Sequence, residues 1–304
     1  MDAPWRDPAW IAGAHAWIEE QTARLGLART GAIEQPHIYP WSTVMRVPTA
    51  QGDVWFKANT GQLQHEAALV SLVAERVPER VPPLLASDLE RGWMLMADAG
   101  QRLREVVAAE RSLTRWLDIL PATARIQLAM EPDVEALLAL GVPDMRLATL
   151  PEGYARLMDL LDAEDRYRLG LARVVELAEE LATFGIAETL QHDDLNDGQV
   201  FVRDGTHLVM DWGDACVSHP FFTLSVALEG VIAWGVDDVE NSEDTEPYLR
   251  AYLAPYAERY DGDLVAASRL AIRLGWACRA VNGHLPSDKE HTLTRLRMFL
   301  DGRP

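Results

Sequence analysis

The sequence has 304 residues, 48% of them apolar, and its 47 acidic and 28 basic residues give a net charge of −19. A chain of this length and apolar content can bury a core as one large domain or as two lobes. So acidic a chain would repel the phosphate backbone of DNA or RNA, and we expect no nucleic-acid partner. The same charge would attract a cationic small molecule, or would serve only to keep the protein in solution.

Three features predict a soluble, cytoplasmic protein without a membrane partner. The N-terminus lacks the basic, apolar and small-residue order of a secretory signal. The longest apolar run, residues 221–236, contains Glu229 and is too short to span a bilayer. The two cysteines, Cys216 and Cys278, are far apart and lack the spacing of metal ligands, so we predict two buried thiols rather than a disulfide or a zinc site.

The first part of the chain is predicted to form a small α+β unit. Apolar residues at intervals of three and four predict helices, and alternating or β-branched runs beside turns predict strands. The predicted helices are 7–27 and 62–77, and the predicted strands are 42–47, 53–58, 84–86 and 93–97. The turn at Thr49-Ala50-Gln51-Gly52 joins the first two strands into a β-hairpin.

From residue 98 onward most of the chain has helical periodicity. Helical segments are predicted near 101–110, 112–129, 133–141, 152–162 and 165–184, and again from 221 to the end. Between them, 200–203 and 207–210 flank Asp204-Gly205, a dipeptide that favours a tight hairpin. The predicted fold class is therefore α+β, with a β-rich N-terminal lobe over 1–97 and a larger helical lobe over 98–304.

The densest group of polar residues lies on both sides of this second hairpin. Residues 191–199 read Gln-His-Asp-Asp-Leu-Asn-Asp-Gly-Gln, and the hairpin is followed by Asp211-Trp-Gly-Asp214. Folding the hairpin back would bring Asp211 towards Asp194 and Gln199. Several carboxylates beside one amide are unfavourable unless a cation or a proton transfer is involved. The pattern therefore predicts a metal-dependent or acid–base site.

This pattern resembles the catalytic loop of the aminoglycoside phosphotransferase and choline kinase-like family, within the protein-kinase-like superfamily. In that family the loop reads His-x-Asp-x-x-x-x-Asn, and a metal-binding Asp follows one hairpin later. His192, Asp194, Gln199 and Asp211 fall on these four positions. The resemblance covers about residues 40–230. It implies a bilobal kinase-like fold and an enzyme that moves the γ-phosphate of ATP, or of GTP, onto a hydroxyl group of a small molecule.

The resemblance also implies a role for each loop residue. Asp194 would orient the acceptor hydroxyl and take its proton, and His192 would brace the loop by hydrogen bonding. Asp211 and Gln199 would hold Mg²⁺ across the phosphates. Two positions depart from the family pattern, because Gln199 stands where Asn is usual and Asn196 stands where His is often found. Gln keeps the amide oxygen and also occurs in the maltokinase-like members of the superfamily, so activity is not excluded.

A nucleotide site is predicted in the N-terminal lobe. Lys57 is the only charged residue in the strand 54–58, which is typical of an edge-strand charge or a snorkelling side chain, or of a lysine with a buried partner. Glu66, on the inner stripe of the next helix, is the candidate partner. In kinase-like folds this Lys–Glu pair positions the α- and β-phosphates. No glycine-rich loop precedes the hairpin, and Ser42 and Thr43 would either contact phosphate or only begin the strand.

Residues 94–100 resemble the linker between the two lobes of the family. The resemblance implies that backbone groups near Ala97 and Ala99 bind the adenine edge, with Met96 beside the base. Asp214 remains open between a second metal ligand, a substrate contact and a helix cap. The C-terminal helices, with Trp234, Trp276 and Arg279, are candidates for the wall of the acceptor pocket.

The predicted acceptor is an aminoglycoside or another antibiotic, a sugar or an amino alcohol. The acidic run within 237–246 favours a cationic acceptor, or is only a solvated loop. The alternative function is a nucleotide-binding pseudokinase with a regulatory role, which Gln199 and the missing glycine loop suggest and which the presence of Asp194 opposes. A protein kinase is disfavoured because no Ala-Pro-Glu sequence follows Asp211-Trp-Gly. The expected assembly is a monomer or a homodimer.

Overall fold

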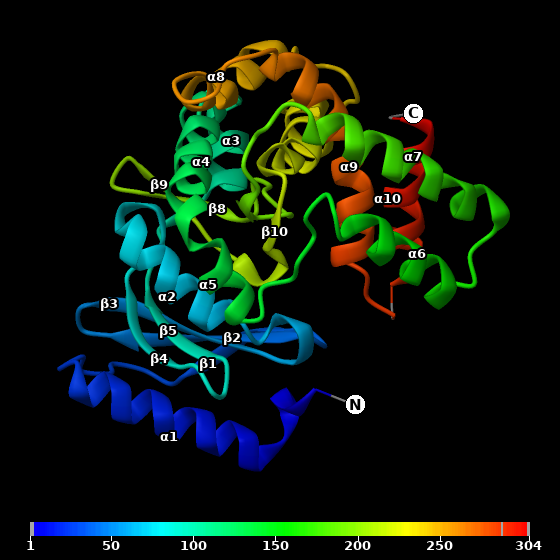
Figure 1. The fold of residues 1–304 in the computed structure, drawn as a ribbon. Coiled ribbons are helices and arrows are strands. Elements are labelled where there is room, and N and C mark those ends of the chain that lie inside the picture. The colour runs from blue at the N-terminus through cyan, green and yellow to red at the C-terminus, as the bar shows by residue number, and fades with distance from the viewer. Residues whose placement is uncertain (1–2, 287, 303–304) are drawn as a thin grey trace. The chain divides into compact units, whose positions relative to one another are not determined.

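The computed structural model describes residues 3–286 and 288–302, which form two compact units (Figure 1). One unit contains the chain up to Gln101 together with Phe201–Gly213, and the other contains Arg102–Val200 and the chain from Asp214 onward. The boundaries fall within β6 (Gln101–Arg102), within β8 (Val200–Arg203) and between Gly213 and Asp214. The sheet lies in the N-terminal part and most helices lie in the C-terminal part, which confirms the predicted α+β class.

An antiparallel sheet of five strands forms the centre of the N-terminal unit, in the order β1-β2-β3-β5-β4. Its strands are β1 (Glu34–Ile38), β2 (Ser42–Thr49), β3 (Gly52–Asn59), β4 (Leu84–Asp88) and β5 (Trp93–Ala97). The predicted hairpin and the two later strands are confirmed. The sequence did not predict β1, because this edge strand is mostly exposed, contains Pro36 and has no apolar alternation.

Two helices cover opposite faces of this sheet, α1 (Pro8–Arg24) and α2 (Glu66–Arg76) (Figure 1). Asp7 caps α1, because its side chain accepts a hydrogen bond of 2.7 Å from the amide of Ala9. Helix α2 begins four residues later than predicted, because a short 3₁₀ turn at Gly61–Leu63 precedes it. Glu66 is therefore at the first position of the helix.

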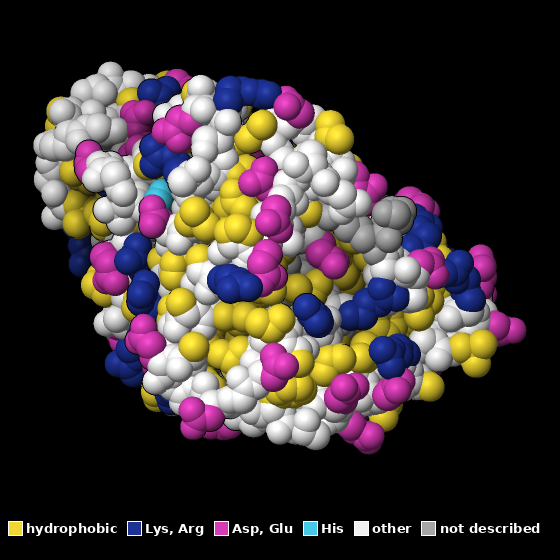
Figure 2. All heavy atoms as spheres, turned by 90° about the horizontal axis from the view of Figure 1, so that it is seen from above, with side chains coloured by type: hydrophobic (Ala, Val, Ile, Leu, Met, Phe, Trp, Pro, Cys, Tyr) yellow, Lys and Arg dark blue, Asp and Glu magenta, His cyan; other side chains and the backbone are white. Residues whose placement is uncertain are grey.

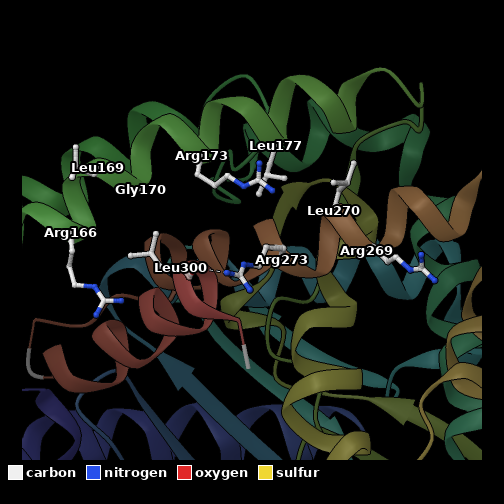
Figure 3. A pocket seen from close by; sticks show the side chains of 9 residues that line it. All are labelled: Arg166, Leu169, Gly170, Arg173, Leu177, Arg269, Leu270, Arg273 and Leu300. Atoms are coloured by element: carbon white, nitrogen blue, oxygen red, sulfur yellow. Dashed lines mark hydrogen bonds between the residues drawn. The ribbon is translucent and has the colours of Figure 1, made fainter. Parts of the chain in front are cut away.

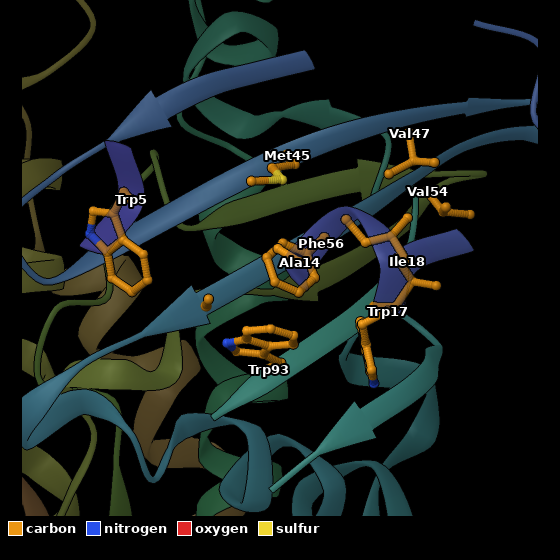
Figure 4. Packing of buried hydrophobic residues seen from close by; sticks show 11 residues of the cluster. Trp5, Ala14, Trp17, Ile18, Met45, Val47, Val54, Phe56 and Trp93 are labelled. Atoms are coloured by element: carbon orange, nitrogen blue, oxygen red, sulfur yellow. The ribbon is translucent and has the colours of Figure 1, made fainter. Parts of the chain in front are cut away.

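The core of the N-terminal unit lies between α1 and the sheet (Figure 4). Trp17 from α1 and Trp93 from β5 both contact the ring of Phe56 on β3, with ring centroids 5.7 and 5.5 Å apart. Such tilted and edge-on aromatic contacts add stability beyond the buried area. Because side chains alternate along a strand, the neighbour of Phe56, Lys57, lies on the other face of the sheet, which α2 covers.

The C-terminal unit is built mainly from helices, as predicted. They are α3 (Leu103–Glu110), α4 (Trp116–Met130), α5 (Val134–Ala139), α6 (Leu150–Leu160), α7 (Asp165–Ala182), α8 (Glu246–Ala257), α9 (Leu264–Asn282) and α10 (Lys289–Asp301). Helix α4 packs on α8, and α9 packs on both α7 and α10. Across residues 3–286 and 288–302, we find no helix with both the length and the apolar character needed to cross a membrane.

Two short strands of the C-terminal unit position the polar loop. β7 (Thr189–Gln191) pairs with β10 (Cys216–Ser218) in an antiparallel ladder that places Gln191 opposite Cys216. The loop from His192 to Gln199 follows β7, and Asp214 lies two residues before β10 begins. Neither strand was predicted, because three residues are too few to show an alternating pattern. The hairpin formed by β8 and β9 (Thr206–Val209) was predicted and is confirmed.

Charged side chains of both signs are interspersed over the face drawn in Figure 2. Several surface pairs are neighbours on one helix, such as Arg156 with Glu152 (2.6 Å) and Arg250 with Glu246 (2.8 Å). Such exposed pairs contribute only about 0.3–0.5 kcal/mol each.

Gly100 is a position where the backbone requires glycine. Its φ is +88°, and a Cβ there would lie 2.3 Å from the carbonyl oxygen of Val202. We expect Gly100→Ala to lower the free energy of unfolding by about 1–3 kcal/mol or more, measured by urea denaturation. The control is Gly13→Ala within α1, where a Cβ meets nothing within 4 Å and alanine should stabilise by about 0.5–1 kcal/mol. Equal effects of the two substitutions would contradict this account of Gly100.

Candidate active site

Several residues selected from the sequence belong to two polar clusters, one in each unit, together with residues that were not predicted. The lysine cluster consists of Lys57, Asn59, Glu66 and Asp211 in the N-terminal unit. The arginine cluster consists of Asp193, Asp194, Asp214, Arg279 and Asn282 in the C-terminal unit. Each group combines one buried cation with several carboxylates.

In the lysine cluster, a single ammonium group binds two carboxylates. The Nζ atom of Lys57 donates to Oε1 of Glu66 at 2.8 Å and to Oδ1 of Asp211 at 2.6 Å. The structure thus brings together the Lys57 and Glu66 side chains that the sequence paired, and adds Asp211 to them. Asn59, which the sequence analysis did not select, also donates its side-chain amide to Glu66.

The two carboxylates of the lysine cluster differ in their access to solvent. The side chain of Glu66 is 1% exposed, whereas that of Asp211 is 49% exposed. Burial raises the pKa of Glu66, and the charge of Lys57 opposes this effect. Burial lowers the pKa of Lys57, but Asp211 and Glu66 outweigh burial and leave that pKa raised, so the lysine stays protonated.

Asp211 also has an unusual backbone conformation. Its φ is +60°, in the left-handed region that residues other than glycine seldom adopt. Such conformations are found preferentially at functional sites, where the surrounding structure compensates for the strain. Met210 follows β9, and Asp211 comes next. The left-handed backbone of Asp211 occurs together with its contact to Lys57.

A small cavity lies beside Lys57 in the N-terminal unit. Its lining residues are Lys57, Glu66, Val70, Val81, Pro82, Met96, Val209, Met210, Asp211 and Trp212. Met96, which the sequence placed beside the nucleotide base, is therefore part of the same cavity as the lysine cluster. Its walls combine apolar side chains with the charged groups of the lysine cluster, and its volume of about 10 Å³ is far below the roughly 300–1,000 Å³ of ligand pockets.

The linker after β5 is held by Asp98, which the sequence analysis did not select. The side chain of Asp98 accepts from the indole of Trp55 at 2.8 Å, and its carbonyl accepts from Arg203 at 2.7 Å. The amide of Ala97 donates to the carbonyl of Pro83, the residue before β4, at 2.9 Å. The adenine contacts of the backbone near Ala97 and Ala99 stay a prediction.

Ser42 and Thr43 are the first residues of β2, and both are buried. The hydroxyl of Thr43 donates to the carbonyl of His37 at 2.8 Å and accepts from the side chain of Gln35 at 2.9 Å. These bonds fix Thr43 as part of the sheet. Ser42 remains the candidate for a phosphate contact.

In the arginine cluster, one guanidinium group serves three carboxylates. Nη2 of Arg279 lies 3.0 Å from Oδ1 of Asp194 and 3.1 Å from Oδ2 of Asp214, and Nη1 lies 3.4 Å from Oδ2 of Asp193. Asn282, one turn later on α9, donates to Asp193 at 2.9 Å. Arg279 is thus a buried member of this cluster, which replaces the hypothesis that it lines an acceptor pocket.

Burial and neighbouring charges shift the pKa values of this cluster in opposite directions. Burial lowers the pKa of Arg279, but the three aspartates outweigh it and leave the pKa raised. Burial raises the pKa of Asp193, and Arg279 and Asn282 oppose that effect. The nearby Arg295 has a pKa lowered to about 10 by burial and by the charge of Arg279. Arg279 and the nearby Arg295 therefore both stay protonated at physiological pH.

The loop around Asp194 is held by its own side chains. The Nδ1 atom of His192 accepts from the amide of Asp194 at 3.4 Å, a bracing contact of the kind the sequence suggested. Asn196 donates to the carbonyl of Asp194 at 2.9 Å and accepts from the amide of Gly198 at 2.8 Å. The side-chain amide of Gln199 donates to Oδ2 of Asp194 at 3.4 Å, which turns its oxygen away from that carboxylate.

Cys216, Cys278 and Asp193 lie together in the C-terminal unit, within reach of one ion. A metal would require deprotonated thiols. Burial raises the pKa of Cys216, and a hydrogen bond with Cys216 together with burial raises that of Cys278. Asp193 is already bound by Arg279 and Asn282. This chemistry favours two neutral thiols over a metal centre.

A larger cavity of about 580 Å³ opens between α7, α9 and α10 (Figure 3). Its lining residues are Arg166, Leu169, Gly170, Arg173, Leu177, Arg269, Leu270, Arg273 and Leu300. Three of its arginines already have partners in the chain, because Arg166 binds Asp301, Arg173 binds Glu176 and Arg273 donates to the carbonyl of Leu300. The contacts of Arg166 and Arg273 join α7 and α9 to α10, that of Arg173 lies within α7, and none involves a predicted site residue.

The remaining acceptor candidates are also bonded within the chain. Trp276 donates its indole N–H to Glu229 at 2.6 Å, and Trp234 donates to the carbonyl of the same residue at 3.1 Å. In the acidic run, Asp237 forms an ion pair with Arg111. Part of the acidic run is therefore neutralised by the protein itself.

The family model for the phosphotransferase enzyme family matches residues 42–263. The chain belongs to this family, and it is a phosphotransferase of the small-molecule kinase class, whose members act on hydroxyl groups. The kinase-like family predicted from the catalytic loop is thereby confirmed. No protein of curated function matches the sequence.

Several solved structures share the fold. A macrolide 2′-phosphotransferase from Brachybacterium faecium has 19% identity and a TM-score of 0.56, with 91% of this chain and 95% of that chain covered. An ethanolamine kinase from Plasmodium vivax has 12% identity and a TM-score of 0.60, with 90% and 84% covered. The streptomycin–ATP–APH(2″)-IIa ternary complex has 13% identity and a TM-score of 0.57, with 94% and 98% covered. At these identities the likeness shows the kinase-like fold.

The buried pair in the lysine cluster predicts a strong dependence of one partner on the other. Lys57→Met leaves the buried Glu66 without its cation, and we expect it to lower the free energy of unfolding by about 3–5 kcal/mol. Lys57→Met combined with Glu66→Leu should recover much of that loss, because no buried charge remains unpaired. Urea denaturation of the four proteins of the cycle measures this coupling. Additive losses would show that the two side chains do not interact.

Proposed function

We propose that this protein transfers the γ-phosphate of ATP, or of GTP, to a hydroxyl group of a small molecule. The observation that carries the proposal is Lys57, a buried lysine that binds both Glu66 and Asp211, residues 9 and 154 positions away in the sequence. In kinase-like enzymes such a lysine contacts the α- and β-phosphates, and a carboxylate beside it holds the metal ion. Membership of the phosphotransferase family supports this reading.

The donor set suits a magnesium ion. Asp211 offers a half-exposed carboxylate, and Gln199 offers an amide oxygen, since its nitrogen donates to Asp194. Both are hard oxygen ligands, which Mg²⁺ prefers. Asp211 and Gln199 are therefore the proposed ligands. When bound, the ion would neutralise charge on the transferred phosphates.

The proposed role of Asp194 is to orient the acceptor. Its side chain is 26% exposed, so a hydroxyl group of a substrate can approach it from solvent. The carboxylate would accept the hydroxyl hydrogen bond, align the oxygen with the γ-phosphorus and take the proton as the bond to phosphorus forms. His192, which bonds the amide of Asp194, is proposed to position the loop rather than to act as a base.

The proposed acceptor is a small molecule with a hydroxyl group, and the charge of the chain favours a cationic one. The net charge of −19 favours the approach of cations, although Asp237 of the acidic run is already paired with Arg111. The solved structures named above include kinases of macrolides and of ethanolamine and a complex with streptomycin. A panel of macrolides, aminoglycosides, sugars and amino alcohols therefore covers the proposed class.

Asp194→Asn tests the acceptor-orienting role. The amide keeps the shape of the side chain but cannot take the proton, so turnover should fall by several orders of magnitude while nucleotide affinity stays nearly unchanged. The measurement is nucleoside diphosphate release from Mg²⁺-ATP in the presence of the acceptor panel, beside nucleotide binding by calorimetry. The matched control is Asp162→Asn at a fully exposed position, which should leave turnover unchanged. Unchanged turnover in Asp194→Asn would remove this residue from the mechanism.

Gln199→Asn tests the proposed metal ligand. Shortening the side chain by one methylene moves the amide oxygen, so the relative activity with Mg²⁺ and Mn²⁺ should change by several-fold. Asp211→Ala should weaken Mg²⁺-dependent nucleotide binding itself. Calorimetric titration of ATP with each metal measures both effects. If Gln199→Asn has the same metal preference and turnover as the unmodified protein, this position is structural.

A further inference from the structure

The conformation of Asp194 depends on a residue that lies far away in the sequence, on α9. Arg279 is buried, with a side chain 6% exposed, whereas the side chain of Asp194 is 26% exposed. The ion pair between them, 3.0 Å from Nη2 to Oδ1, is thus shielded from solvent on the arginine side. The contact is an ion pair, and the attraction between two opposite charges is stronger in a poorly solvated place than between exposed side chains.

The two carboxylate oxygens of Asp194 have different partners. Oδ1 is bound by the guanidinium, while within residues 3–286 and 288–302 the one contact of Oδ2 is that of 3.4 Å from the side-chain amide of Gln199. The terminal torsion of an aspartate is broad and would otherwise let the carboxylate turn. With Oδ1 held, Oδ2 is the oxygen left for a hydroxyl group that approaches from solvent.

The same guanidinium nitrogen also holds the segment that precedes β10. Nη2 of Arg279 binds Oδ2 of Asp214 at 3.1 Å, and Asn282 donates to the carbonyl of Asp214 at 2.7 Å. Asn282 binds Asp193 as well, at 2.9 Å. Arg279 and Asn282, both on α9, therefore hold the loop that contains Asp194. They also hold Asp214, three residues after Asp211.

Arginine is required here for a geometric reason. Its planar guanidinium carries five N–H donors in a fixed fork, so that it can bind several carboxylates at once. A lysine in its place would keep the positive charge but would act as a point charge without the fork. The left-handed backbone of Asp193, with φ +63°, accompanies this arrangement, because Asp193 and its neighbour Asp194 both bind the same side chain.

We propose that Arg279 is a positioning residue for phosphoryl transfer: by binding Oδ1 of Asp194 it directs Oδ2 towards the acceptor hydroxyl, and through Asp214 it fixes the segment beyond Asp211. This inference rests on the proposed function, in which Asp194 orients the acceptor. Arg279 itself contacts neither substrate nor metal in this assignment. Its loss should therefore lower turnover and leave nucleotide binding unchanged.

The test compares Arg279→Gln and Arg279→Lys with the unmodified protein and with Asp194→Asn. Misplacement of a catalytic group by about 1 Å can cost about 100-fold in rate. We expect Arg279→Gln to lower kcat by about 100-fold, with KM for ATP and the calorimetric nucleotide affinity within about 3-fold of the unmodified values. Arg279→Lys should recover part of kcat because it keeps a cation beside the aspartates. If Arg279→Gln does not fold, the kcat of Arg279→Lys still tests the positioning role.

The matched control is Arg273→Gln on the same helix. Arg273 contacts the carbonyl of Leu300 and lines the separate cavity, so its loss should affect stability but not kcat. Equal kcat in Arg279→Gln and Arg273→Gln, or a rise in KM for ATP alone, would overturn the positioning role while Asp194→Asn still confirms the kinase reaction. If the unmodified protein and Asp194→Asn release diphosphate equally with every acceptor, the proposed function fails and the positioning role fails with it.

Discussion

Both units depend on one constraint, that acidic side chains can be buried only where a cation binds them. A buried carboxylate without a partner costs several kcal/mol, and removing one member of a buried ion pair is among the most destabilising changes a protein can suffer. Lys57 meets this requirement for Glu66, and Arg279 meets it for Asp193. The chain has a net charge of −19, and the fold buries one of these two cations in each cluster beside acidic side chains.

The two cations share a pattern that bears on function. Each binds one carboxylate that is almost fully buried and a second that reaches solvent. The side chains of Glu66 and Asp193 are each 1% exposed, whereas those of Asp211 and Asp194 are 49% and 26% exposed. The buried partner fixes the cation, and the cation then fixes the exposed partner. Asp211 and Asp194 are the residues to which the proposed reaction assigns chemistry, whereas Asp214, a third carboxylate on Arg279 with a side chain 31% exposed, serves to hold the backbone.

Much of the fold was predictable because it follows from local periodicity. The helix that became α1 and the hairpin of β2 and β3 were predicted from apolar spacing and a turn, and they match the structure within a few residues. The strands that were missed lack such a signal. β1 is a mostly exposed edge strand with a proline, and β7 and β10 have three residues each, so their pairing with a neighbour defines them rather than their own residues.

The sequence by itself determined the family, the fold class and the identity of the loop residues around Asp194, because these depend on residue types at fixed spacing. It also paired Lys57 with Glu66, because one lies in a strand and the other lies on the inner face of the helix that follows. Only the tertiary structure decided that Arg279 binds Asp194 and that Asp98 holds the linker. Electrostatic attraction depends on distance and burial in space, and no spacing rule connects a loop to a helix that follows it by more than eighty residues.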